Sequence, residues 1–212
     1  MNVRMIALVA AAGAASLANA QAVTGFSGGS QFDSFFGGAV AGDTVGWRFT
    51  VNSDIIVTDL GVWNADTQLG SEGLTSDHMV GIWDLVSGAL LVSGTAGPGG
   101  TAVGDFTYAA VSETTLTTSG SYVIGALYNA GGVSDGDSYI SSAASLTTDA
   151  AISFGGAHSP DVGDLGFTLP TTFSGAGSNG RLGPNFLFRP VPSPSAFALL
   201  GLGGLVAGRR RR

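Results

Sequence analysis

The chain has 212 residues and contains no cysteine, which excludes disulfides, thiol chemistry and cysteine-ligated metals. Its residues are 44% hydrophobic and only 11% charged, a balance that excludes an intrinsically disordered protein. Between residues 21 and 190, three arginines and no lysine face fifteen acidic residues, and the resulting net charge of −12 disfavours binding to nucleic acid.

The N-terminus has the three parts of a secretory signal peptide. Arg4 precedes an apolar stretch at residues 5–17, and the Ala-Asn-Ala sequence at residues 18–20 is a small-x-small cleavage site. The apolar stretch is too short to cross a bilayer as a helix. We therefore expect residues 1–20 to direct export through the secretion translocase, and signal peptidase to leave a mature chain that begins at Gln21.

Alternating hydrophobicity predicts β-strands throughout the body, residues 21–190. In residues 44–51 the odd-numbered side chains are large and apolar and the even-numbered ones are small or polar, the pattern of a half-buried strand. Similar runs, bounded by Gly, Asn, Asp or Ser, occur at residues 55–63, 78–85, 89–95, 105–111 and 121–128. Weaker strand candidates lie at residues 151–154, 165–169 and 185–189, whereas residues 130–150, 155–164 and 174–183 are expected to be loops. No helical period is sustained, so we expect a single all-β domain, an antiparallel β-sandwich or jelly roll.

The C-terminal residues 191–212 contain the parts of a membrane-sorting tail. A Pro-rich segment leads into an apolar run at residues 196–208, which four arginines follow. As a transmembrane helix this run would be about 20 Å long, short of the ~30 Å hydrocarbon core of a bilayer. The arginines should stay cytoplasmic while the preceding chain is exported. The tail therefore predicts a transient anchor in the inner membrane.

This tail resembles the PEP-CTERM sorting signal, which exosortases recognise and cut. The residues that carry the resemblance are Val191, Pro192, Ser193, Pro194 and Ser195 in the proline motif, and Arg209, Arg210, Arg211 and Arg212 at the end. Ser193 departs from the family pattern, which has Glu at this position. The resemblance implies cleavage near the proline motif by an exosortase-like protease. It also implies release to the cell surface or the extracellular matrix, often among cells that produce exopolysaccharide.

The body resembles secreted bacterial β-sandwich modules that precede such tails. The resemblance rests on residues 46–50 (GWRFT), 59–63 (DLGVW), 78–84 (HMVGIWD) and 122–126 (YVIGA), and it covers about half of the domain. These motifs are structural, so the resemblance implies a fold and no active site.

The sequence offers no convincing catalytic motif. Residues 25–29 (GFSGG) match the G-x-S-x-G pattern, but this pattern activates its serine only at a strand-to-helix turn of an α/β sheet. The only histidines that could serve Ser27 as a base are His78 and His158, and neither lies in a recognisable partner motif. We therefore expect that the protein is not an enzyme.

Asp135 and Asp137 are candidate calcium ligands. They flank Gly136 and offer oxygen ligands at alternate positions, as calcium loops do, but a complete loop with a closing Glu is absent. The alternative is a solvated turn without any metal.

Trp63 and Trp83 are candidate sugar-stacking residues. If Val62 and Ile82 face the core, strand alternation turns both tryptophans outward, where they would form a platform for sugar rings. The alternative is burial under the loop at residues 68–77.

The sequence thus predicts an exported structural or adhesive protein of the cell surface or biofilm matrix. The alternative is a carbohydrate-binding module, with or without a calcium ion at Asp135 and Asp137.

Overall fold

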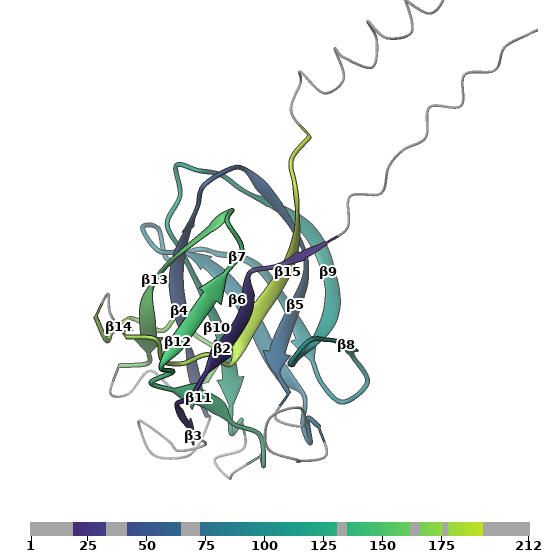
Figure 1. Ribbon diagram of the computed structural model, residues 1–212, viewed down its shortest axis with the longest axis vertical. Coiled ribbons are helices and arrows are strands. Elements are labelled where there is room, and N and C mark those ends of the chain that lie inside the picture. The colour runs from purple at the N-terminus through teal and green to yellow at the C-terminus, as the bar shows by residue number, and fades with distance from the viewer. Residues whose placement is uncertain are drawn as a thin grey trace, which may run out of the picture.

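The computed structural model describes residues 19–32, 42–64, 73–130, 135–161, 166–175 and 178–192. Within these ranges all regular structure is β-strand, and every pairing between the named strands is antiparallel. Figure 1 shows the strands gathered into one layered body. The first and last described segments of the chain both lie at the same side of this body. The prediction of an all-β, antiparallel fold is confirmed.

A five-stranded sheet forms one layer, with the order β1-β15-β5-β9-β8. Its strands are β1 (Ala20–Gln21), β5 (Ile55–Trp63), β8 (Thr101–Val103), β9 (Phe106–Leu116) and β15 (Pro184–Pro190). In the sheet β1 lies beside β15, so the first and last strands of the body are neighbours. The predicted strand at 55–63 has the bounds of β5, and β9 continues five residues beyond the predicted end.

A six-stranded sheet forms the other layer, with the order β14-β13-β4-β10-β6-β7. Its strands are β4 (Asp43–Val51), β6 (His78–Asp84), β7 (Leu90–Ala96), β10 (Tyr122–Tyr128), β13 (Ile152–Ser159) and β14 (Thr172–Phe173). The predicted strands at 44–51, 78–85, 89–95 and 121–128 all appear here, with ends within one residue of the prediction.

Two short ribbons correct the predicted loops. Strand β2 (Val23–Ser27) pairs with β12 (Ser145–Thr148), and β3 (Ser30–Phe32) pairs with β11 (Tyr139–Ser141), within the stretch predicted to be a loop at 130–150. Strand β13 likewise runs on to Ser159, into the predicted loop at 155–164. Conversely, residues 166–169 form no strand, although a weak one was predicted there.

The core lies between the two sheets and consists largely of aromatic rings. Trp47 and Phe49 on β4 contact Phe186 on β15, with ring centroids 6.1 and 5.0 Å apart. Because β4 and β15 belong to different sheets, these contacts place the two sheets face to face. Trp47 also donates a hydrogen bond from Nε1 to the carbonyl oxygen of Pro184 at 2.8 Å, so that it links the sheets through a polar contact as well.

Candidate functional site

Trp83 points away from the core but is buried all the same. Alternation along β6 places it on the outer face of the six-stranded sheet, as predicted, yet only 4% of its surface is exposed. Residues 166–170 lie over this face and lead into the edge strand β14, and residues 166–175 together are here called the strap. Phe167 of the strap packs on Trp83 with ring centroids 5.1 Å apart, and the indole lies over Gly81 and Gly125, where a larger side chain would collide with it.

Trp63 is covered on the outer face of the five-stranded sheet. It is fully buried, and Phe26 on β2 packs against it with ring centroids 6.0 Å apart. Phe106, the residue opposite Trp63 on the neighbouring strand β9, lies in the same cluster. The interpretation of Trp63 and Trp83 as an exposed sugar platform is therefore wrong. The strap and β2 cover them, and residues 68–72 of the loop suggested as a cover lie outside the described residues.

The clearest polar cluster in the described chain joins His78 to the two predicted calcium ligands. The nitrogen and carboxylate atoms of His78, Asp135 and Asp137 lie within 4.8 Å of one another. His78 begins β6 and faces the same side as the core residues Val80 and Ile82, and it has no exposed surface. The sequence singled out the two aspartates but missed the histidine. The histidine alternates in step with the apolar residues Val80 and Ile82, which predicts that its side chain is buried. A buried histidine needs polar partners, and this requirement could have pointed to the cluster.

The hydrogen bonds of His78 identify its charge state. Nδ1 lies 2.9 Å from the carbonyl oxygen of Leu127, and Nε2 lies 2.9 Å from Oδ2 of Asp137. Asp137 also accepts hydrogen bonds from the backbone N–H groups of Thr75 and Ser76, and these bonds favour its ionised carboxylate. Because a carbonyl and a carboxylate only accept, both ring nitrogens must donate, and His78 is an imidazolium cation.

The pKa values of the pair shift in the directions that keep both groups charged. Burial lowers the pKa of His78, but hydrogen bonds to Asp137 and Leu127, together with the charges of Asp135 and Asp137, raise it above 6.5 overall. Burial raises the pKa of Asp137, but the hydrogen bonds from His78, Thr75 and Ser76 lower it below 3.8 overall. The cluster is thus a buried ion pair that ties two loops to the end of the sheet.

The same contacts do not fit a calcium loop. Calcium takes roughly six to eight oxygen ligands, which must be free to turn toward the ion. The carboxylate of Asp137 is already occupied by three N–H donors, and that of Asp135 accepts the N–H groups of Asn129 and Asp137. A calcium ion here would also lie beside the imidazolium of His78. The interpretation of Asp135 and Asp137 as calcium ligands is therefore not supported by the geometry.

We expect the ion pair to give the domain a stability maximum between two pKa values. The contribution of His78 is fully present below 6.5, its unfolded value, and is lost as pH rises through the raised folded pKa. The contribution of Asp137 is present above 3.8 and is lost as pH falls through the lowered folded pKa. Urea unfolding midpoints measured across pH should show both limbs, and His78→Phe should flatten the alkaline one. An alkaline limb unchanged in that variant would contradict the assignment.

Ser27 is not placed for nucleophilic catalysis. Its hydroxyl lies 2.7 Å from the hydroxyl of Ser145 across the β2–β12 ribbon, and strand β3 follows it instead of a helix. Gly28 and Gly29 have φ angles of 65° and 90°, which glycine adopts without strain, so they turn the chain between β2 and β3. His158 is buried and bonds through Nδ1 to the carbonyl oxygen of Pro170. The G-x-S-x-G pattern here therefore reflects a turn between strands.

The predicted processing signals lie almost entirely outside the described residues. Val191 and Pro192 are described, and the N–H group of Val191 donates to the carbonyl oxygen of Asp54 at 3.1 Å. Residues 1–18 and 193–212, which include Ser193, Pro194, Ser195 and Arg209 to Arg212, are not. In the described part of the chain, no helix has the length and apolar character needed to cross a bilayer.

Comparisons of the chain with protein-family models, with curated proteins and with solved structures found no match.

Proposed function

We propose that the protein is an exported structural or adhesive module of the cell surface or biofilm matrix, sorted by an exosortase-type system. The observation that carries this proposal is the pairing of β1 with β15, in which Gln21, the proposed mature N-terminus, lies opposite Leu187. The two ends of the body thus leave from one place (Figure 1). A module attached there to a sorting tail presents its remaining surface to its surroundings.

The proposed processing sites lie close to the two ends of the folded body. Strand β15 ends at Pro190, and the proline motif begins with the next residue. At the other end, the proposed signal peptidase site falls within β1, between Ala20 and Gln21. A sorting signal of residues 191–212 therefore fits the end of β15, and removal of a signal peptide of residues 1–20 would leave a β-sandwich domain of residues 21–190 that begins with the second residue of β1.

A role without catalysis is supported by what the polar side chains do. In the described residues, His78 and Asp137 neutralise each other, while His158 and Ser27 bond to a backbone carbonyl and to another hydroxyl. Each is therefore engaged in holding the fold together. We propose on this basis a scaffold whose surface, and not an active site, carries its function.

Mass spectrometry of the native protein tests the sorting proposal. Protein from the cell-surface fraction should begin at Gln21 and end near the proline motif, because both terminal segments are removed during export. A variant with Arg209 to Arg212 replaced by glutamine is the matched control, and it should accumulate with its tail uncut. Surface protein that still ends at Arg212 would make the tail an ordinary anchor. Protein that retains Met1 and stays in the cytoplasm would contradict export itself.

A further inference from the structure

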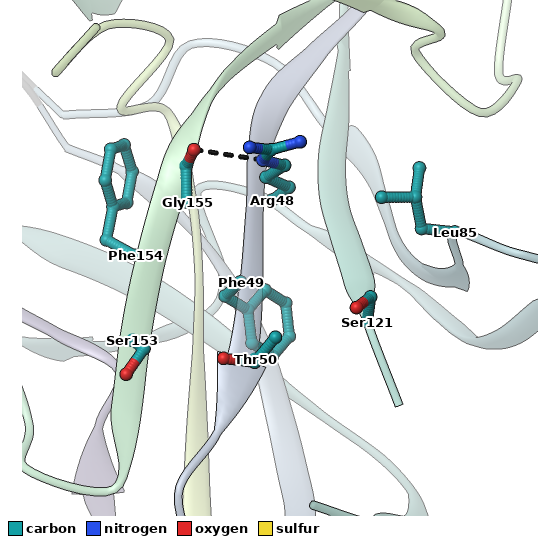
Figure 2. A pocket seen from close by; sticks show the side chains of 8 residues that line it. All are labelled: Arg48, Phe49, Thr50, Leu85, Ser121, Ser153, Phe154 and Gly155. Carbon is teal, nitrogen blue, oxygen red and sulfur yellow. Dashed lines mark hydrogen bonds between the residues drawn. The ribbon is translucent and has the colours of Figure 1, made fainter. Parts of the chain in front are cut away.

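A pocket of about 340 Å³ opens on the outer face of the six-stranded sheet. Its volume lies near the lower end of the range for small-molecule sites, roughly 300–1,000 Å³. Figure 2 shows the residues around it, which include Arg48 and Thr50 on β4, Ser153 and Gly155 on β13, and Leu85 and Ser121 on the opposite side. Alternation along β4 turns Arg48 and Thr50 outward because Trp47 and Phe49 face the core.

The guanidinium group of Arg48 is held in a fixed orientation at this pocket. Its Nε donates a hydrogen bond to the carbonyl oxygen of Gly155 at 3.0 Å (Figure 2). One face of the guanidinium stacks on Phe173 of the strap, with its central carbon 3.6 Å from the ring centroid. Within the described residues its two terminal nitrogens have no hydrogen-bond or ion-pair partner. The fork of Arg48 is therefore oriented but still able to bind a ligand.

Arg48 is also distinctive among the cations of the body. The domain carries three arginines against fifteen acidic residues. Arg189 is paired with Glu113 at 2.7 Å, and Arg181 lies over the ring of Tyr139. Arg48 forms no salt bridge with any described residue, so its charge does not stabilise the domain in that way. It is instead a site where an anion can be held against the charge of the surrounding protein.

The chemistry of the pocket indicates which anion would fit. A guanidinium fork binds a carboxylate through two parallel hydrogen bonds. The hydroxyls of Thr50, Ser121 and Ser153 offer both donors and acceptors, and the side chain of Leu85 supplies apolar surface. We infer that this pocket binds a sugar that carries a carboxylate, a uronic acid residue. The charge of −12 on the body disfavours a densely anionic polymer, so the fit is to a terminal or isolated uronate.

Three probes separate the parts of this assignment when titrated into the full chain in non-ionic detergent. Glucuronate carries both the carboxylate and the hydroxyls, acetate only the carboxylate, and glucose only the hydroxyls. We expect glucuronate to shift the amide resonances of Arg48, Ser121 and Gly155, and to bind about tenfold more tightly than either other probe. Acetate binding as tight as glucuronate binding would make this a simple anion site. Equal binding of glucose, or no binding of glucuronate, would equally overturn the assignment.

Variants then test whether Arg48 is responsible. Arg48→Gln should weaken glucuronate binding about tenfold or more, and Arg48→Lys should not restore it, because lysine lacks the planar fork. Arg189→Gln removes a cation elsewhere and should leave binding unchanged. If Arg48→Gln fails to fold, Ser153→Trp fills the pocket while keeping the arginine and should abolish binding. Binding that survives in Ser153→Trp, or in a folded Arg48→Gln, would contradict the inference.

Discussion

Replacement of Trp63 or Trp47 by alanine should lower the free energy of unfolding by about 3–5 kcal/mol in each case. Both side chains are fully buried, so truncation removes their transfer energy and leaves a cavity. Val86→Ala is the control, since its side chain is 88% exposed and its loss should change stability by less than about 0.5 kcal/mol. Urea unfolding measures all three. An unchanged stability of Trp63→Ala would restore the exposed-platform interpretation that its burial contradicts.

Phenylalanine at the same two positions should separate packing from hydrogen bonding. Trp47 donates from Nε1 to the carbonyl oxygen of Pro184, whereas Nε1 of Trp63 has no partner in the described part of the chain. Trp47→Phe leaves a buried acceptor without that donor, and Trp63→Phe removes a polar group that is itself unsatisfied. We expect the first change to cost about 1–3 kcal/mol more than the second. Equal costs in urea unfolding would mean that the Pro184 bond contributes nothing.

Asp137→Asn should destabilise the domain by about 3–5 kcal/mol near neutral pH. The change leaves His78 buried without its counter-charge, and a buried ion pair costs most when only one partner is removed. Asp135→Asn should cost less, because the oxygen of Asp135 lies 3.9 Å from Nδ1 of His78 and its side chain is 13% exposed. Urea unfolding at a fixed pH measures both changes in stability.

A double variant provides the internal check on this ion pair. Asp137→Leu combined with His78→Leu removes both charges together. It should therefore cost clearly less than the sum of the two single replacements, because the single changes each strand a buried charge. Additive costs would show that the two residues do not interact, and would also contradict the charge state assigned to His78.

The sequence predicted the strands of the sandwich better than the layers outside it. In β4 and β5 the periodic pattern is strong, because one face of each strand packs against the opposite sheet. In strand β12 the alternation is only between exposed and half-buried side chains, so no buried apolar face marks residues 145–148, and the sequence predicts a loop there. For Trp83, alternation gave the correct direction but not the burial, which depends on Phe167 in the strap. A local pattern specifies which way a side chain points and not what lies above it.

The polar sites show the same limit. Asp135 and Asp137 were recognisable because ligand spacing is a local signal, but their partner His78 lies 59 residues from Asp137 in the chain. Only the pairing of β6 with β10 brings the histidine to the loop that follows β10. Arg48 was likewise visible in the sequence merely as an outward residue of a strand. Its orientation depends on Gly155 and Phe173, which two other segments of the chain contribute.

The neighbouring positions of β1 and β15 have a mechanical consequence. Gln21 and Pro190 lie near the same end of two adjacent antiparallel strands, so tension between the two termini would pull the pair apart one hydrogen bond after another. Tension between the C-terminus and the far end of the sheet would instead load all the bonds between β15 and β5 in shear at the same time. A module tethered by its C-terminus should therefore withstand a load that enters through its sheets better than one applied between its own ends.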